Sequence, residues 1–187
     1  MHFVAWRYAV VVLHLLSNDY VISIHLTDAE VAAIAEVEST SNILKLVTKL
    51  TSLRFAAIAK VTDERWIACA VRDEINFGVD PGGELDLEAT ICTELRTHRT
   101  PVVISCASRD PVYASHPLPR HYGFESYFSI PIILADGTFF GTLCGNDPLP
   151  AKLEDPDLLQ TLVDFAKLIA TTLDMHNRLA CDKAVEA

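Results

Sequence analysis

The chain has 187 residues, half of them apolar, and a formal net charge of −10. A chain of this length buries roughly 70% of its unfolded surface, so one domain with one substantial core is expected. Nucleic-acid backbones are bound by clustered Lys and Arg, which this acidic sequence lacks, so we expect no nucleic-acid partner.

The cysteines and histidines argue for a reduced protein without a metal centre. Five cysteines are an odd number without paired spacing, and each lies where a small buried apolar residue would serve. No pairing of Cys and His has the spacing of a zinc site. We therefore expect no metal site and a cytoplasmic location, where thiols stay reduced.

Residues 1–26 are apolar but do not have the length of a membrane helix. Their longest uncharged core, residues 8–16, is far shorter than the roughly 20 apolar residues that span a bilayer. No small-residue cleavage pattern of a signal peptide follows it. The sequence predicts no membrane span here, and an N-terminal extension that is not part of the core.

Helical signals begin after this extension. Thr27 and Glu30 form a capping box, and apolar residues then recur at helical spacing to about residue 53. The polar run at residues 39–42 predicts a break, so this stretch is one helix or two. Two buried strands are expected next, at residues 55–61 and 66–71, joined by a turn as a hairpin.

The middle of the chain alternates loops with short elements. A polar, glycine-containing loop is predicted over residues 72–85, followed by a short helix at 88–97 and a third strand at 101–104. Residues 105–121 contain several prolines and little periodicity, which predicts a long structured loop with a helical turn at most. Loops of this length inside a compact domain are usually functional.

Residues 122–147 predict a second hairpin in the middle of an antiparallel sheet. Its strands, at 126–134 and 138–144, flank the turn signal Asp136-Gly137. Pro131 cannot donate a ladder hydrogen bond, so a bulge or a sheet edge is expected there. Gly141 and Gly145 indicate close approach of backbone or ligand.

A long helix closes the domain. Asp155 is its expected cap, with Pro156 in the first turn. The apolar face first indicates packing on the core, but it also suits pairing with a second copy in a homodimer. This apolar face consists of Leu158, Leu159, Leu162, Phe165, Leu168, Ile169 and Leu173.

The sequence predicts that residues 27–178 form the domain with its flanking helices and that residues 179–187 form a polar tail.

This order of elements, together with several motifs, resembles the GAF domain family of small-molecule sensors. The resemblance covers about residues 43–173. It implies a GAF/PAS-like α+β fold: an antiparallel sheet of five or six strands, with terminal helices on one face and pocket-forming loop-helix segments on the other. The motifs are Leu53-Arg54-Phe55, Thr62-Asp63-Glu64-Arg65-Trp66, Pro101-Val102-Val103-Ile104, Asp110-Pro111-Val112-Tyr113, Tyr122-Gly123-Phe124, and Gly141-Thr142-Leu143-Cys144 with Asp147-Pro148-Leu149-Pro150.

The resemblance further implies a ligand pocket between one sheet face and residues 72–85 and 105–121. Aromatic side chains would supply its wall, and a few polar groups would orient the ligand. A purely structural reading stays open: the aromatic residues suit a core, and Asp110 before Pro111 suits a turn. The candidate pocket residues are Phe77, Cys92, Asp110, Tyr113, His116, Tyr122, Phe124, Tyr127 and Ser129.

The cofactor is unknown at this stage, but a covalent bilin is not expected. In the related phytochromes the chromophore is attached to a Cys, usually followed by His, shortly before a Gly that enters a strand. The corresponding stretch here is Ala114-Ser115-His116, which has no thiol. Cyclic nucleotides, haem, small acids and no ligand at all remain open.

The resemblance therefore implies a regulatory module of signal transduction, of the kind attached to bacterial histidine kinases and diguanylate cyclases in two-component systems. It would sense a small molecule or transmit through dimerisation, without catalysis of its own. One alternative is a thiol redox enzyme resembling free methionine sulfoxide reductase, although the Cys arrangement of that family is not reproduced. The other alternative is a ligand-free interaction scaffold.

Overall fold

The computed structural model describes residues 41–85 and 91–185, except for the side chains of residues 41, 92–94 and 176–185. The predicted extension at residues 1–26 and the first part of the helix predicted for 27–53 lie outside these residues. The second part is helix α2 (Ser41–Thr51), which begins inside the predicted break.

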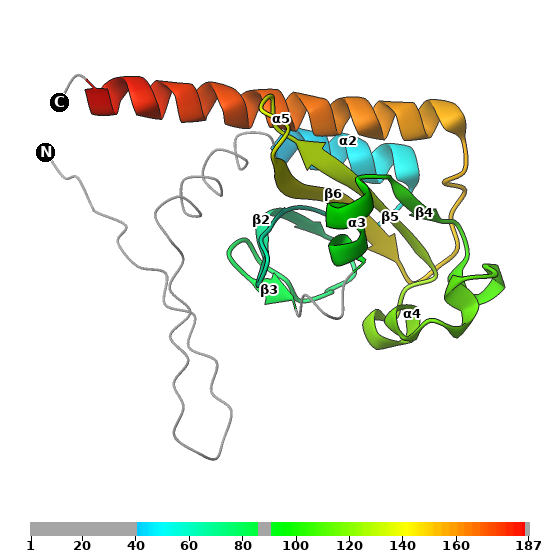
Figure 1. Ribbon diagram of the computed structural model, residues 1–187. Helices are drawn as coiled ribbons and strands as arrows, with labels where there is room; N and C mark the ends of the chain where they lie inside the picture. The colour runs from blue at the N-terminus through cyan, green and yellow to red at the C-terminus, as the bar shows by residue number, and fades with distance from the viewer. Residues whose placement is uncertain (1–40, 86–90, 186–187) are drawn as a thin grey trace, which may run out of the picture.

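A six-stranded antiparallel sheet forms the centre of the domain, in the order β3-β2-β1-β6-β5-β4 (Figure 1). The predicted α+β fold is confirmed, and both predicted hairpins are present. The second hairpin gives β6 a central position between β1 and β5. Strand β3 was not predicted, because it is a two-residue strand within the expected loop. The strands are β1 (Phe55–Val61), β2 (Trp66–Asp73), β3 (Glu84–Leu85), β4 (Val102–Ile104), β5 (Ser126–Ile133) and β6 (Phe139–Asp147).

The special residues of the second hairpin behave as predicted. Strand β4 pairs with β5 only at residues 127–129, so Pro131 lies where β5 has become the sheet edge. The register of β5 on β6 also shifts between Ile132 and Ile133. At Gly141 a Cβ atom would lie 1.9 Å from the carbonyl oxygen of Ala59. The strands β1 and β6 therefore approach too closely there for any side chain.

Helices α2 and α5 (Pro156–Val185) lie side by side on one face of the sheet (Figure 1). The predicted cap is confirmed, because Asp155 Oδ1 accepts a hydrogen bond from Asp157 N at 2.9 Å. The predicted apolar face of α5 is correct for its buried members but wrong for Leu168, which is 53% exposed. The core beneath these helices includes Leu44, Val47, Ile58, Phe128, Ile130, Leu143, Leu162, Ile169 and Leu173.

The opposite face of the sheet carries the shorter helices α3 (Cys92–His98) and α4 (Pro117–Tyr122) (Figure 1). The predicted long loop at residues 105–121 contains α4 and two 3₁₀ turns, Ala107–Arg109 and Tyr113–Ser115. His116 caps α4, since its Nδ1 accepts a hydrogen bond from Leu118 N at 3.3 Å. Gly123 ends the helix with a φ of +68°, a conformation that favours glycine. This layer covers the sheet face that α2 and α5 leave open.

Candidate functional site

Strand alternation decides which side chains face the short helices. Along β6, Leu143 packs into the core under α2 and α5, whereas Cys144 and Asn146 face the other way. On the neighbouring strand, Phe55 is the register partner of Asn146 and faces the same side. These side chains form the floor of a cavity.

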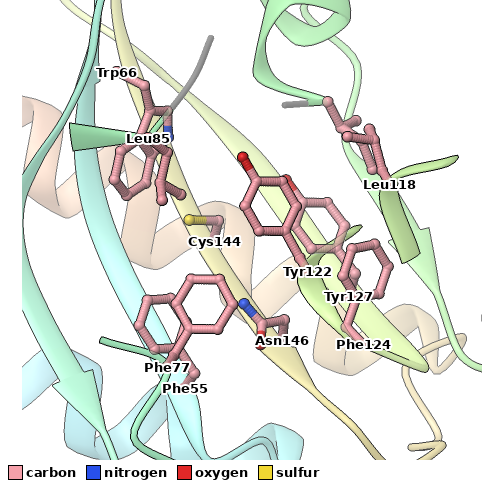
Figure 2. A pocket seen from close by; sticks show the side chains of 11 residues that line it. Phe55, Trp66, Phe77, Leu85, Leu118, Tyr122, Phe124, Tyr127, Cys144 and Asn146 are labelled. Carbon is pink, nitrogen blue, oxygen red and sulfur yellow. The ribbon is translucent and has the colours of Figure 1, made fainter. Parts of the chain in front are cut away.

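The cavity has a volume of about 40 Å³ and is lined by eleven side chains (Figure 2). Strands β1, β2, β5 and β6 supply its floor. Phe77 from the β2–β3 loop, the 118–124 segment around α4 and the residues at 85 and 91 supply its cover. The lining residues are Phe55, Trp66, Phe77, Leu85, Ile91, Leu118, Tyr122, Phe124, Tyr127, Cys144 and Asn146.

Ring contacts join the floor of the cavity to its cover. The ring centroids of Phe55 and Phe77 are 4.6 Å apart, and those of Phe77 and Tyr122 are 5.9 Å apart. Phe124 stacks on Tyr127 with a centroid distance of 5.2 Å. Such separations are typical of favourable aromatic pairs, so the rings fix the shape of the cavity.

A larger groove of about 480 Å³ lies outside the cavity. It runs between residues 75–79, strand β3 and the end of α4, and shares four lining residues with the cavity. Because Phe77 and Tyr122 line both spaces and their rings contact each other, this pair is the boundary between them. The four shared residues are Phe77, Leu85, Tyr122 and Asn146.

Asn146 and Ser129 are polar side chains on this sheet face without a hydrogen-bond partner within the part of the chain that the structure describes. Asn146 is 7% exposed and extends into the cavity toward Phe55 (Figure 2). The hydroxyl of Ser129, the register partner of Cys144, is fully buried. Buried polar groups are normally paired, so such groups call for an explanation.

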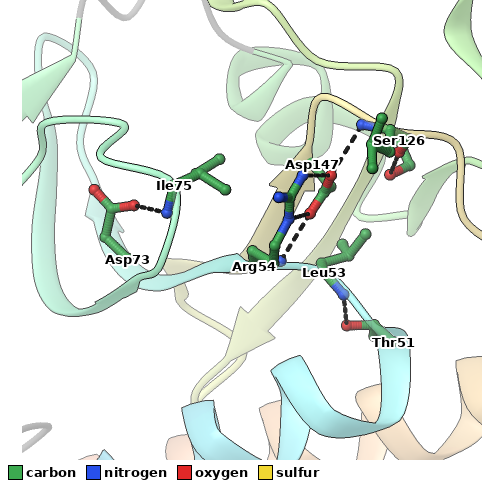
Figure 3. Close-up of polar contacts among 8 residues, drawn as sticks. Thr51, Leu53, Arg54, Asp73, Ile75, Ser126 and Asp147 are labelled. Carbon is green, nitrogen blue, oxygen red and sulfur yellow. Dashed lines mark hydrogen bonds and ion pairs between the residues drawn. The ribbon is translucent and has the colours of Figure 1, made fainter.

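Asp73 holds the loop that carries Phe77. Its Oδ1 accepts a hydrogen bond from Ile75 N at 3.0 Å (Figure 3). Its Oδ2 accepts one from Gly78 N at 3.1 Å. Burial alone would raise the pKa of Asp73, but backbone hydrogen bonds from residues 75–78 hold that pKa below its ordinary value. The cover of the cavity at Phe77 is thus positioned by a carboxylate at the end of β2.

Four of the predicted pocket residues line the cavity: Phe77, Tyr122, Phe124 and Tyr127. Their role as ligand contacts remains a prediction. Cys92 begins α3, and its side chain lies outside the described part of the chain.

The structure does not bring the other predicted residues to the cavity. Asp110 Oδ1 instead accepts hydrogen bonds from the backbone nitrogens of Val112 at 2.8 Å and Tyr113 at 3.0 Å, which is the turn-forming role. The ring of Tyr113 packs on His116, with centroids 5.7 Å apart. Ser129 shares the sheet face but lies outside the lining.

Sequence reasoning missed every strand residue of the cavity except Tyr127, and it also missed Ile91 and Leu118. The alternation of β6 places Asn146 two residues after Cys144, and that signal was available in the sequence. The contributions of Leu85, Ile91 and Leu118 had no comparable signal, because tertiary packing of loops and helix ends brings them in. The missed residues are Phe55, Trp66, Leu85, Ile91, Leu118, Cys144 and Asn146.

The sequence model of the GAF domain matches residues 36–173. This chain belongs to the GAF domain family. The match includes α2, all six strands and most of α5, so the cavity lies wholly within the GAF domain. No curated protein matches the chain significantly.

Solved structures of GAF domains share this fold. A GAF domain region from Geobacter sulfurreducens PCA superposes with a TM-score of 0.62 at 16% identity, covering 80% of this chain and 99% of that one. The blue-light absorbing form of the Thermosynechococcus elongatus PixJ GAF domain gives 0.64 at 11% identity, covering 86% and 96%. Type II free methionine-R-sulfoxide reductase from Thermoplasma acidophilum gives 0.56 at 15%, covering 78% and 95%.

The described cysteines of this GAF domain do not resemble a redox centre. Cys69 and Cys144 are buried, Cys106 is half-buried, and none of these three forms a disulfide. The Sγ atom of Cys106 lies 3.6 Å from Glu125 Oε2, whereas a reactive thiol needs a neighbouring cation. Among the described residues no group of three His, Cys, Asp or Glu could hold a metal ion. The same residues contain no helix long and apolar enough to cross a membrane.

Proposed function

We propose that this GAF domain is a cytoplasmic small-molecule sensor of a signal-transduction protein, of two-component type, which acts as a homodimer without catalysis of its own. The supporting observation is that one strand contributes side chains both to the cavity and to the core under the terminal helices. Strand β6 carries Cys144 and Asn146 in the cavity and Leu143 in the core under α5. A ligand that moves β6 therefore acts on both layers.

Transmission requires that the ligand binds one arrangement of the helices better than the other. The contacts between α5 and the hairpin of β5 and β6 offer such a link. Ala135 N, in the turn of this hairpin, donates a hydrogen bond to Asp174 Oδ2 at 2.8 Å. The C-terminal part of α5 extends past the sheet, where it can pass a change of position to an output domain (Figure 1).

The outer surface of the two terminal helices supports the homodimer. Leu46 and Leu50 lie one turn apart on α2 and are 47% and 49% exposed. Leu168 and Met175 lie seven residues apart on α5 and are 53% and 60% exposed. Residues seven positions apart lie on the same side of a helix, and apolar residues at this spacing occur where two helices pack along their length. We assign this surface to a second copy of the chain.

The sensing role is tested by native mass spectrometry of the full chain purified from its own organism, with a denatured sample as the reference. A bound mass that is lost on denaturation supports sensing. A clean ligand-free mass, unchanged after incubation with extract of that organism, contradicts it and favours the interaction scaffold.

The scaffold alternative has one observation in its favour, the small volume of the cavity. Phe124→Ala combined with Tyr127→Ala separates the two readings. For a sensor, the double variant abolishes the ligand-dependent rise in melting temperature as well as lowering stability. For a scaffold, it lowers stability alone. The redox alternative is not favoured, because of the burial of Cys69 and Cys144.

A further inference from the structure

We infer that the cavity binds the uncharged aromatic ring of a small molecule whose amide-like edge forms hydrogen bonds with Asn146. This inference rests on the proposed sensor function and specifies the chemical class of its ligand. Three features of the site carry it: the absence of charge in the lining, the unpartnered amide of Asn146, and the ring pair at the entrance.

The described lining disfavours a charged group in the inner cavity. Among the described residues, the eleven that line it include aromatic and aliphatic side chains, a cysteine and an asparagine, but no Asp, Glu, Lys, Arg or His. An ion transferred into such surroundings loses its hydration and gains no counter-charge. Phosphate groups, carboxylates and ammonium groups are therefore disfavoured within the cavity.

Asn146 supplies the polar recognition. A side-chain amide offers both a donor and an acceptor in one plane, so it matches another amide or a lactam edge. This side chain is 7% exposed and has no hydrogen-bond partner among the described residues. An amide that faces a cavity without a protein partner can pair with the polar edge of a ligand there. Phe55, its register partner on β1, lies beside it to pack against the ligand ring.

The entrance is the contact between Phe77 and Tyr122. At about 40 Å³ the closed cavity is smaller than the roughly 150 Å³ that admits benzene. Tyr122 is the last residue of α4 and precedes Gly123, so its ring lies at a point where the backbone changes direction. Displacement of this ring joins the cavity to the groove of about 480 Å³ and gives the volume of an ordinary small-molecule site.

The groove determines where polar substituents go. Besides the shared residues, its lining includes the polar side chains of Asn76, Glu84 and His121. Glu84 is paired with Arg65. A substituent on the ring therefore meets polar side chains once it passes Tyr122. The ligand has its uncharged ring inside and its polar part outside, at the mouth.

The test compares benzamide with benzoate, which have nearly the same size and shape but differ in charge. Each is titrated into the full chain while amide NMR shifts and heat of binding are recorded. Benzamide is expected to saturate, with shifts at Asn146 and Tyr122, and benzoate to bind at least tenfold more weakly. Asn146→Leu is expected to weaken benzamide about tenfold, the effect of one lost hydrogen bond. The matched control Asn42→Leu, at an exposed position of α2, is expected to leave the affinity for benzamide unchanged.

Equal or tighter binding of benzoate overturns the inference, and so does the absence of benzamide shifts at Asn146 in the wild-type chain. The wild-type NMR shifts decide the matter even if Asn146→Leu does not fold. The outcome is separable from the sensor proposal: a native ligand that has no uncharged aromatic ring, found by mass spectrometry, overturns this inference alone. Benzamide binding without any native ligand overturns the sensor function and leaves the chemistry of the cavity standing.

Discussion

Arg54 and Asp147 join the start of β1 to the end of β6 through a bidentate ion pair (Figure 3). Arg54 Nε lies 2.8 Å from Asp147 Oδ2, and Arg54 Nη2 lies 2.7 Å from Oδ1. The same carboxylate accepts hydrogen bonds from Arg54 N at 3.1 Å and Leu149 N at 2.9 Å. This network flanks the register pair of Phe55 and Asn146, so it fixes the end of the cavity floor.

Replacement of this carboxylate should destabilise the fold. Asp147 is 3% exposed and satisfies four donors, whereas an asparagine there would direct an NH₂ group at one of them. Asp147→Asn is expected to lower the free energy of unfolding by about 2 kcal/mol, measured by urea denaturation. The matched control is Asp164→Asn, in an exposed pair with Lys167, which should change little. Equal effects of both substitutions would contradict a structural role for the Arg54 network.

The contribution of Asp147 should depend on pH in the acid range. Burial alone would raise the pKa of Asp147, but hydrogen bonds from the Arg54 side chain and from backbone amides hold that pKa below its ordinary value. Because the folded pKa is the lower one, the stabilisation is complete above the unfolded value of about 3.9 and is lost as pH falls toward the folded pKa. The stability difference between wild type and Asp147→Asn should be constant above about pH 5 and shrink below about pH 4. A difference that stays constant through this acid range would refute the assignment.

Local patterns predicted the sheet well because each strand has its own signal. The strand at residues 55–61 was predicted with its observed ends, and the Asp136-Gly137 turn correctly located the second hairpin. Leu168 was wrongly predicted to be buried. Helical spacing shows which apolar residues share one side of the helix, but not how many of them the sheet covers. Asp110 was predicted as a ligand contact because an aspartate can serve either in a turn or in a binding site. In the structure its carboxylate accepts hydrogen bonds from backbone amides, which is the role in a turn.

Asp73 should control the order of the cavity cover. Asp73→Ala removes the acceptors for Ile75 N and Gly78 N, so hydrogen exchange at these amides should accelerate at least tenfold. Global stability should fall by only about 1 kcal/mol, because the rest of the loop is near the surface. In the control Glu74→Ala, which removes a surface pair with Arg72, exchange in the loop should stay as in wild type. Unchanged exchange in Asp73→Ala would show that packing of Phe77 alone holds the loop.

Substitutions at two glycines should lower the stability of the fold by different amounts, because they destabilise it for different reasons. Gly141→Ala places a Cβ 1.9 Å from the backbone oxygen of Ala59, so the central strands must separate, at a cost of about 3 kcal/mol. Gly137→Ala meets no atom within 4 Å, and its φ of +84° alone costs about 1 kcal/mol. Thermal denaturation of both variants gives the order. A larger loss at Gly137 than at Gly141 would contradict the close approach of β1 and β6.

The proposed homodimer should dissociate when its apolar surface is charged. Leu168 is 53% exposed on the outer side of α5, so Leu168→Glu should not disturb the monomer core but should place two charges in the proposed interface. Sedimentation velocity is expected to show a dimer for wild type and a monomer for this variant, with unchanged circular dichroism. The control Val112→Glu charges an apolar residue that is 64% exposed in the 105–121 segment, away from the terminal helices, and should remain dimeric. A wild-type chain that stays monomeric at every accessible concentration, or a Leu168→Glu variant that stays dimeric, would remove this surface from the mechanism. The signal would then have to leave the domain through α5 of a single chain.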